Sequence, residues 1–255
     1  MVPGLATWLS MLLAGAGASL DAVLPAEAAP APMHRWERLG GADFLVVPAP
    51  AVTPDTPVVT YRVLVERRYA ASADDFAGVV DEVLADAGGW AAAGYAFVPV
   101  EGDADVTIVL AAPKTTDRLC APLRTGGAFS CGRGGRAVIN ANRFLHGAAT
   151  YRKQLPAYRT YVINHEVGHL LGFEHRRCPY RGAQAPVMLQ QTKSLSGCRR
   201  NATPRADELA VLAARPPRYL RERVAEVSTP PVTAAVADAA TVRSREGRPP
   251  LRSAP

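Results

Sequence analysis

The chain has 255 residues, 48% of them hydrophobic and 20% charged. This length and composition fit one sizeable globular domain with tails, and they exclude a fibrous or wholly disordered chain. The net charge is +6, but no stripe of basic and aromatic residues runs through the middle of the sequence. We therefore expect no specific nucleic-acid partner.

The N-terminus carries the pattern of an export signal. An apolar run, "LATWLSMLLAGAGASL", precedes Ala26-Glu27-Ala28, which fits the small-x-small cleavage pattern. Residues 1–28 are predicted to be a signal peptide and the protein to be secreted or cell-surface. No Lys or Arg precedes the run, so a retained anchor is the alternative, although the run is short for a membrane span. Membrane contact is expected only if this segment is kept.

Residues 29–57 are rich in proline and alanine and are predicted to be a linker or pro-segment. Order is expected to begin with a half-buried strand at 58–66, where apolar and polar residues alternate. A helix should follow from Ser72 to Gly88, opened by a capping box of Ser72 and Asp75. Its buried face has helical spacing: Phe76, Val79, Val80, Val83 and Leu84.

Further strands are predicted at 95–101, 105–112 and 136–141, and helices from Pro156 to Leu171 and over 205–215. Residues 216–255 lack an apolar period and are predicted to be disordered. The folded domain is therefore placed at 58–215. Strands and helices in this order indicate an α+β fold. The sequence carries no signal for the oligomeric state.

The four cysteines point to disulfides, because an even number in an exported chain is typical of bridged pairs. Three pairings are possible. The sequence-local pairing is preferred, since each pair then brackets a loop rich in glycine or proline. It joins Cys120 to Cys131 and Cys178 to Cys198.

The stretch "NHEVGHLLGFEH" carries the chemistry of the chain. His165 and His169 are four residues apart on the predicted helix, so both rings lie on one face and can share one Zn²⁺. Glu166 lies about 100° around the helix, where a carboxylate can act as general base. Gly172 is expected to end the helix with a positive φ, so that His175 returns to the same metal.

This pattern is the full H-E-x-x-H-x-x-G-x-x-H signature of metzincins. Three imidazoles leave a fourth position open, as in catalytic rather than structural zinc sites. The signature also requires a methionine turn, which "APVMLQQT" supplies with Met188. The alternative is that Met188 only fills the hydrophobic core. Three histidines suit zinc best, although other first-row divalent ions also bind such a site.

"LPAYRTYVINHEVGHLLGFEHRRCP", "APVMLQQT" and "LSGCRRN" together resemble a family of exported, metzincin-like bacterial proteins catalogued as a domain of unknown function. The resemblance covers about residues 58–205. It implies a zincin-like fold: a twisted mixed sheet, a backing helix, an active-site helix and a small C-terminal subdomain with the Met-turn. It also implies one catalytic zinc at His165, His169 and His175, with Glu166 as general base.

The function expected from these residues is that of an exported zinc metallopeptidase acting on peptides or proteins, including cell-wall peptides. Two alternatives remain open at this point. One is a non-catalytic surface or binding module stabilised by zinc, which a fourth protein ligand would support. The other is a metal-dependent amidase that acts on a non-peptide amide, for which the same residues would serve.

Overall fold

The computed structural model describes residues 35–50 and 58–217. The predicted signal peptide at 1–28, the segment 51–57 and the tail from residue 218 lie outside these ranges. The described strands are β1 (Arg35–Leu39), β2 (Ala42–Val46), β3 (Val58–Glu66), β4 (Ala96–Pro99), β5 (Val106–Ala111), β6 (Cys131–Arg133) and β7 (Arg136–Asn140). The helices are α1 (Ala73–Ala85), α2 (Pro113–Cys120), α3 (Ala141–His146), α4 (Leu155–Leu170) and α5 (Ala206–Ala214).

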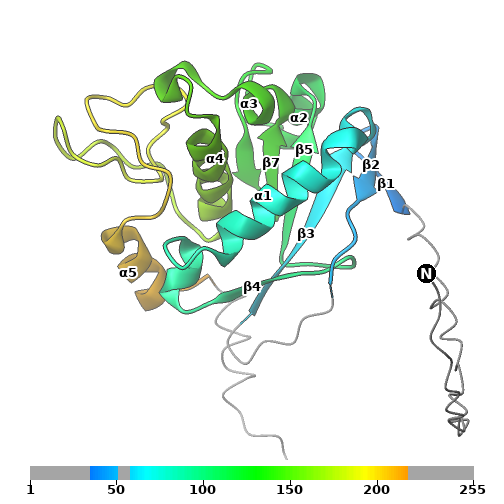
Figure 1. Cartoon of the computed structure of the whole chain (residues 1–255), viewed down its shortest axis with the longest axis horizontal. Helices are drawn as coiled ribbons and strands as arrows, with labels where there is room; N and C mark the ends of the chain where they lie inside the picture. The colour runs from blue at the N-terminus through cyan, green and yellow to red at the C-terminus, as the bar shows by residue number, and fades with distance from the viewer. Residues whose placement is uncertain (1–34, 51–57, 218–255) are drawn as a thin grey trace, which may run out of the picture. The chain divides into compact units, whose positions relative to one another are not determined.

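The strands form one mixed sheet in the order β1-β2-β3-β5-β7-β6, with β4 paired to the first half of β3. The pairs β3–β4, β3–β5 and β5–β7 are parallel, whereas β1, β2 and β6 pair antiparallel with their neighbours. Figure 1 shows α1 and α4 crossing the same face of this twisted sheet. The predicted α+β class is therefore confirmed, with helices packed on a mixed sheet.

The main core lies between that face and α1 and α4. Side chains of β3 and β5 that point toward the helices meet Phe76 and Val80 of α1 and Ile163 and Val167 of α4. Alternate residues point to the opposite face, as the two-residue period of a strand requires. There Leu64 and Val109 pack with Leu119 and Cys120 of α2. The central strand β5 is thus buried on both of its faces.

The strand predicted at 58–66 coincides with β3, and the strands predicted at 95–101, 105–112 and 136–141 correspond to slightly shorter β4, β5 and β7. The helices predicted from Pro156 and over 205–215 correspond to α4 and α5. The short elements β6, α2 and α3 were not predicted. Strand β6 has three residues and α2 has eight, which is too few to produce a clear hydrophobic period in the sequence.

The prediction that residues 29–57 form a linker is wrong for 35–46. These residues form the hairpin of β1 and β2, which adds to the edge of β3. Gly40 and Gly41 have φ values of 55° and 76°, as a two-residue hairpin turn with positive φ at both positions requires. Phe44 of β2 is fully buried. The folded domain therefore begins before residue 58.

The predicted capping box at the start of α1 is also wrong. Ser72 makes no capping hydrogen bond, because it ends a 3-10 turn over Arg67–Ser72 and the chain is already helical when it enters α1. The Asp75 carboxylate instead pairs with Arg159 of α4 at 3.2 Å. The helix ends at Ala85 rather than at Gly88, since Asp86 is extended and its carboxylate accepts the Gly88 N–H.

The predicted disulfides are confirmed: Cys120 is bonded to Cys131, and Cys178 to Cys198. Two disulfides are compatible with an extracellular protein. None of the helices in the described ranges has both the length and the apolar character that a membrane span needs.

Candidate metal centre

His165 and His169 lie one turn apart on α4, with ring centroids 5.0 Å from each other. Backbone carbonyls fix both rings through Nδ1. His165 Nδ1 lies 2.8 Å from the Val187 oxygen, and His169 Nδ1 lies 2.8 Å from the Phe173 oxygen. A carbonyl can only accept, so each Nδ1 carries the proton and each Nε2 keeps its lone pair free. This is the arrangement that metal-ligating histidines commonly adopt.

His175 reaches the same point because the chain reverses directly after α4. Gly172 has a φ of 92°, its N–H bonds to the His169 carbonyl and the Phe173 N–H bonds to the Gly168 carbonyl. These two bonds form a Schellman motif, which ends a helix at a residue with positive φ. Gly172 thus ends the helix with a positive φ, as its position in the sequence predicted.

The three imidazoles form a group that could hold a metal ion. Their ligand atoms all lie within 4.8 Å of one another, and no other residue of the described ranges joins the group. His169 Nε2 and His175 Nε2 are 3.2 Å apart. Nitrogens about 2.0–2.1 Å from a tetrahedral zinc lie roughly 3.3–3.4 Å from each other. The donor set and its spacing therefore fit one small divalent cation.

The surroundings of His165 and His175 favour their neutral imidazole forms. Burial lowers the pKa of His165 to about 3, against the opposing effect of its hydrogen bond to Val187. Burial also lowers the pKa of the half-exposed His175, as does the neighbouring charge of His169. Neutral imidazole is the form that binds metals, so little competition from protons is expected at neutral pH.

Glu166 is 5% exposed and lines the same cavity as the three histidines. Burial raises the pKa of its carboxyl group to about 8, while the Gly132 N–H acts in the opposite direction. Gly132 lies in β6, which packs so closely on α4 that an added Cβ there would overlap the Glu166 carbonyl and lie 2.7 Å from His169 Cβ. The backbone of β6 thus runs directly beside the candidate base.

The cavity around these residues has a volume of about 530 Å³. Its floor is formed by the histidines and Glu166. The loop 121–130, which the Cys120–Cys131 disulfide closes, forms part of its wall together with β6, and the segment 190–193 forms another part. Strand β6 ends the strand order of the sheet, so one of its edges has no strand partner among the described residues.

Met188 is fully buried and packs against α4 at Gly168, which lies between His165 and His169 in the sequence. An added Cβ at Gly168 would overlap Met188 Sδ and lie 2.9 Å from Trp90 Cζ2. The helix therefore needs a glycine at this point of the motif, because the methionine and the indole occupy the space of a side chain. Trp90 also donates from Nε1 to the Asn164 carbonyl at 2.9 Å, which ties the same turn of α4 in place.

Glu208 of α5 is a positioning residue that the sequence did not reveal. It is fully buried, and its carboxylate accepts the N–H groups of Val187 at 3.0 Å, Met188 at 3.1 Å and Arg205 at 3.0 Å. The Val187 carbonyl in turn fixes His165. The sequence can reveal a glutamate in the first turn of a helix that bonds back to the residue before the helix. It does not reveal the bonds of that glutamate to residues 187 and 188.

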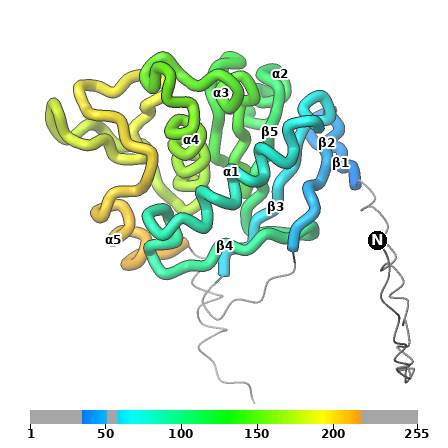
Figure 2. Tube along the Cα trace, in the orientation of Figure 1, coloured from blue at the N-terminus to red at the C-terminus, as the bar shows by residue number. Residues whose placement is uncertain are grey.

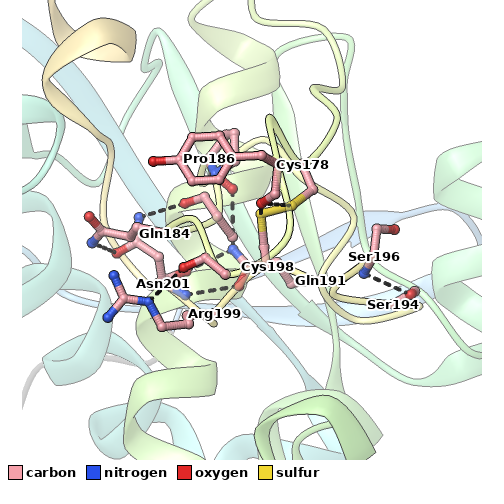
Figure 3. Close-up of a disulfide and its surroundings, with 12 residues drawn as sticks. Cys178, Gln184, Pro186, Gln191, Ser194, Ser196, Cys198, Arg199 and Asn201 are labelled. Carbon is pink, nitrogen blue, oxygen red and sulfur yellow. Dashed lines mark hydrogen bonds between the residues drawn. A yellow bond between two sulfur atoms is a disulfide. The ribbon is translucent and has the colours of Figure 1, made fainter.

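Side chains rather than secondary structure hold the segment that carries Met188. Figure 3 shows Gln191 and Asn201 bonded to each other beside the Cys178–Cys198 disulfide. Gln191 Nε2 also donates to the Pro186 and Asn201 carbonyls, and Asn201 Nδ2 donates to the Ala185 carbonyl. In Figure 2 this segment, coloured yellow, runs beside α4 and on to α5. The network keeps the Met188 turn against the helix.

Two tyrosines near the site differ in what they can do. Tyr180 is 71% exposed and is not among the residues that line the cavity, so its hydroxyl is not placed to stabilise an oxyanion there. Tyr161 does line the cavity, but its hydroxyl donates to the Leu189 carbonyl and accepts the Gln191 N–H. Its hydroxyl hydrogen is thus already engaged.

The family model described as "Protein of unknown function (DUF3152)" matches residues 32–210. The match covers most of the chain, and the chain belongs to this family. It includes the β1–β2 hairpin, in agreement with the earlier start of the folded domain. No curated protein matches the chain.

Proposed function

We propose that the chain is an exported zinc-dependent peptidase with a zincin-like fold of the metzincin type. The observation that carries the proposal is the open three-histidine group, with a buried glutamate beside it in the floor of a cavity. The disulfides agree with export. The full signature H-E-x-x-H-x-x-G-x-x-H supports the same class.

Nε2 donors of His165, His169 and His175 would hold the zinc ion. When bound, zinc supplies a Lewis acid that polarises a carbonyl oxygen and increases the acidity of water. The residues of the chain keep this donor set in order. Val187 and Phe173 hold the His165 and His169 rings in the required tautomer, and Gly172 lets the chain bring His175 back.

Glu166 is the proposed general base. It follows His165 on α4 and lines the cavity, so its carboxylate faces the space where a substrate carbonyl and a water molecule can meet. The carboxylate takes the proton of the attacking water and passes it to the nitrogen that leaves. The scissile C–N bond then breaks to give a carboxylic acid and an amine.

A peptide fits this site better than a small amide. The free edge of β6 can pair with an extended chain through backbone hydrogen bonds, as edge strands do with peptide ligands. Gly132 brings that edge next to Glu166. A purely structural zinc site would need a fourth protein ligand, and none joins the group among the described residues. A binding module and a small-amide hydrolase are therefore less well supported.

The test is hydrolysis of a mixed peptide library by the zinc-loaded wild type and Glu166→Gln. The substitution keeps the shape of the side chain and removes its basicity, so we expect unchanged zinc content and a loss of at least about 10²-fold in cleavage rate. Asp207→Asn is a matched control, because this exposed carboxylate lies outside the cavity. Full cleavage by zinc-loaded Glu166→Gln would contradict the proposal.

A further inference from the structure

The charged side chains that line the cavity, apart from the histidines, are three cations and two carboxylates. Arg124, Arg133 and Lys193 lie in its walls, and all three are exposed. The structure gives none of them an ion pair with an acidic side chain of the described ranges, although eight such pairs occur elsewhere. The acidic lining residues are Glu166, which is the proposed base, and Glu174. The walls thus present cations that protein carboxylates do not neutralise.

Lys193 lines the same cavity as the three histidines. It lies two residues after Gln191, whose N–H bonds to the hydroxyl of Tyr161, and the Tyr161 ring lies 5.3 Å from the His165 ring. The Lys193 Nζ lies 5.0 Å from the centroid of the Phe129 ring, which also lines the cavity. A cation over an aromatic face is held by the ring quadrupole but keeps its N–H donors for other partners.

The backbone that carries Lys193 is fixed to α4. Gln191 is fully buried and its N–H bonds to the Tyr161 hydroxyl at 2.8 Å. The Thr192 hydroxyl lies 3.1 Å from the Tyr158 hydroxyl, and the Lys193 N–H bonds to the Gln190 carbonyl. The lysine therefore extends from an anchored turn rather than from a free loop.

The loop 121–130, which also lines the cavity, is anchored as well. Asp117 accepts the Thr125 hydroxyl and the Gly127 N–H, and Asn140 Nδ2 donates to the Gly127 carbonyl. Arg143 Nε donates to the Ala128 carbonyl at 2.6 Å. With the disulfide at its ends, this loop presents Arg124 and Phe129 to the cavity from a fixed frame.

From this arrangement we infer that the site selects substrates that carry a carboxylate next to the scissile amide, and that Lys193 binds that carboxylate. Arg124 and Arg133 add to the positive field of the cavity. The inference rests on the proposed peptidase function and names its substrate class. The carboxylate can belong to an acidic side chain within a peptide or to the C-terminus of a short peptide, because the ammonium recognises the same group in both.

The experiment compares three versions of each peptide in a small library. One has an internal Glu and an amidated C-terminus, the second has Gln in place of Glu with the same amide, and the third has Gln and a free C-terminal carboxylate. Cleavage is measured with the zinc-loaded wild type, and binding is measured by fluorescence polarisation with zinc-loaded Glu166→Gln.

We expect the carboxylate versions to bind and react about tenfold better than the neutral version, as one hydrogen bond to a charged group would give. The preference should weaken as NaCl is raised, because the lysine is exposed and screened. An advantage of the first version assigns the carboxylate to a side chain, and an advantage of the third assigns it to the C-terminus. Lys193→Gln should remove the preference and Lys193→Arg should keep it, whereas Lys153→Gln, an exposed lysine outside the cavity, should change nothing.

The outcomes separate this inference from the proposed function. Cleavage without any preference for a carboxylate overturns the inference and leaves the peptidase proposal intact. A carboxylate preference that the Lys193→Gln variant retains in full also overturns the inference and leaves the peptidase proposal intact. A binding preference that depends on Lys193, with no cleavage of any peptide, supports the carboxylate site and contradicts the peptidase. If no peptide is cleaved and no carboxylate version binds preferentially, both the inference and the peptidase proposal are overturned.

Discussion

The two halves of the histidine group are held by different means. His165 and His169 lie on α4, where regular backbone bonding and a buried apolar face fix the helix against the sheet. His175 and the wall that carries Lys193 belong to residues 173–205, where the structure has no helix and only one isolated bridge, between Gln184 and Arg199. Side chains such as Glu208 and Gln191 hold that half by bonding to its backbone. The candidate metal site thus combines a regular half and an irregular half.

This difference shows what each half depends on. The backbone of the helical half is held by hydrogen bonds that do not depend on side-chain identity, although Gly168 has no room for a larger side chain. The irregular half depends on individual buried polar groups, each of which costs about 1–3 kcal/mol if its partner is left unsatisfied. The two halves meet at close range at Gly168 and Met188, and hydrogen bonds from His165 to Val187 and from Gln191 to Tyr161 also join them.

The largest effect is expected for His169→Ala, which removes a ligand of the helical half. The zinc affinity should fall by more than the roughly 10–100-fold that loss of an outer partner causes. Metal content after dialysis against a weak chelator measures this. His146→Ala, at the end of α3 and outside the group, should keep its zinc. Equal zinc retention by the two variants would break the assignment of the ligands.

Gly168→Ala tests the contact between the halves. The new methyl group would overlap Met188 Sδ and crowd Trp90, so we expect a loss of about 1–3 kcal/mol in the free energy of unfolding. Gly78→Ala is the matched control in α1, because nothing lies within 4 Å of an added Cβ there. It should stabilise the protein by about 0.5–1 kcal/mol. Denaturant unfolding of both variants should therefore give shifts of opposite sign, and a common sign would contradict the close packing.

Glu208→Gln tests the irregular half alone. The new amide would turn an NH₂ group toward the N–H groups that the carboxylate now accepts. We expect a loss of ~1–2 kcal/mol in the free energy of unfolding. Zinc affinity should also fall, because the Val187 carbonyl that holds His165 would no longer be fixed. Asp207→Asn, next to it but exposed, should cost less than about 1 kcal/mol. Equal effects of the two substitutions would show that Glu208 does not position the irregular half.

The smallest effect is expected for Tyr180→Phe. The side chain is 71% exposed and lies outside the cavity lining, so both stability and kcat/KM should change little, within about 0.5 kcal/mol. Steady-state hydrolysis of the best library peptide measures kcat/KM. A drop of tenfold or more would show that the irregular half contributes a hydroxyl to the reaction.

The sequence predicted the helical half well because its signals are local. His165 and His169, Glu166 and the ending at Gly172 all lie within one periodic stretch, and their spacing alone gives the geometry. Glu208 was not predicted, because its partners at 187 and 188 are about twenty residues away in the chain. The β1–β2 hairpin was missed for another reason. Its Gly-Gly turn signal lies within a segment whose proline and alanine content indicates a linker.

We propose that the three histidines hold one zinc ion and leave one position open for chemistry. X-ray absorption at the zinc edge of the purified chain tests this proposal most directly. We predict one zinc ion per chain with three imidazole ligands at about 2.0–2.1 Å, one further light-atom ligand that is not imidazole, and no sulfur. The further ligand should be exchanged when a small chelating inhibitor such as acetohydroxamate is added. A sulfur ligand, a fourth imidazole, or a shell that acetohydroxamate leaves unchanged would contradict the claim.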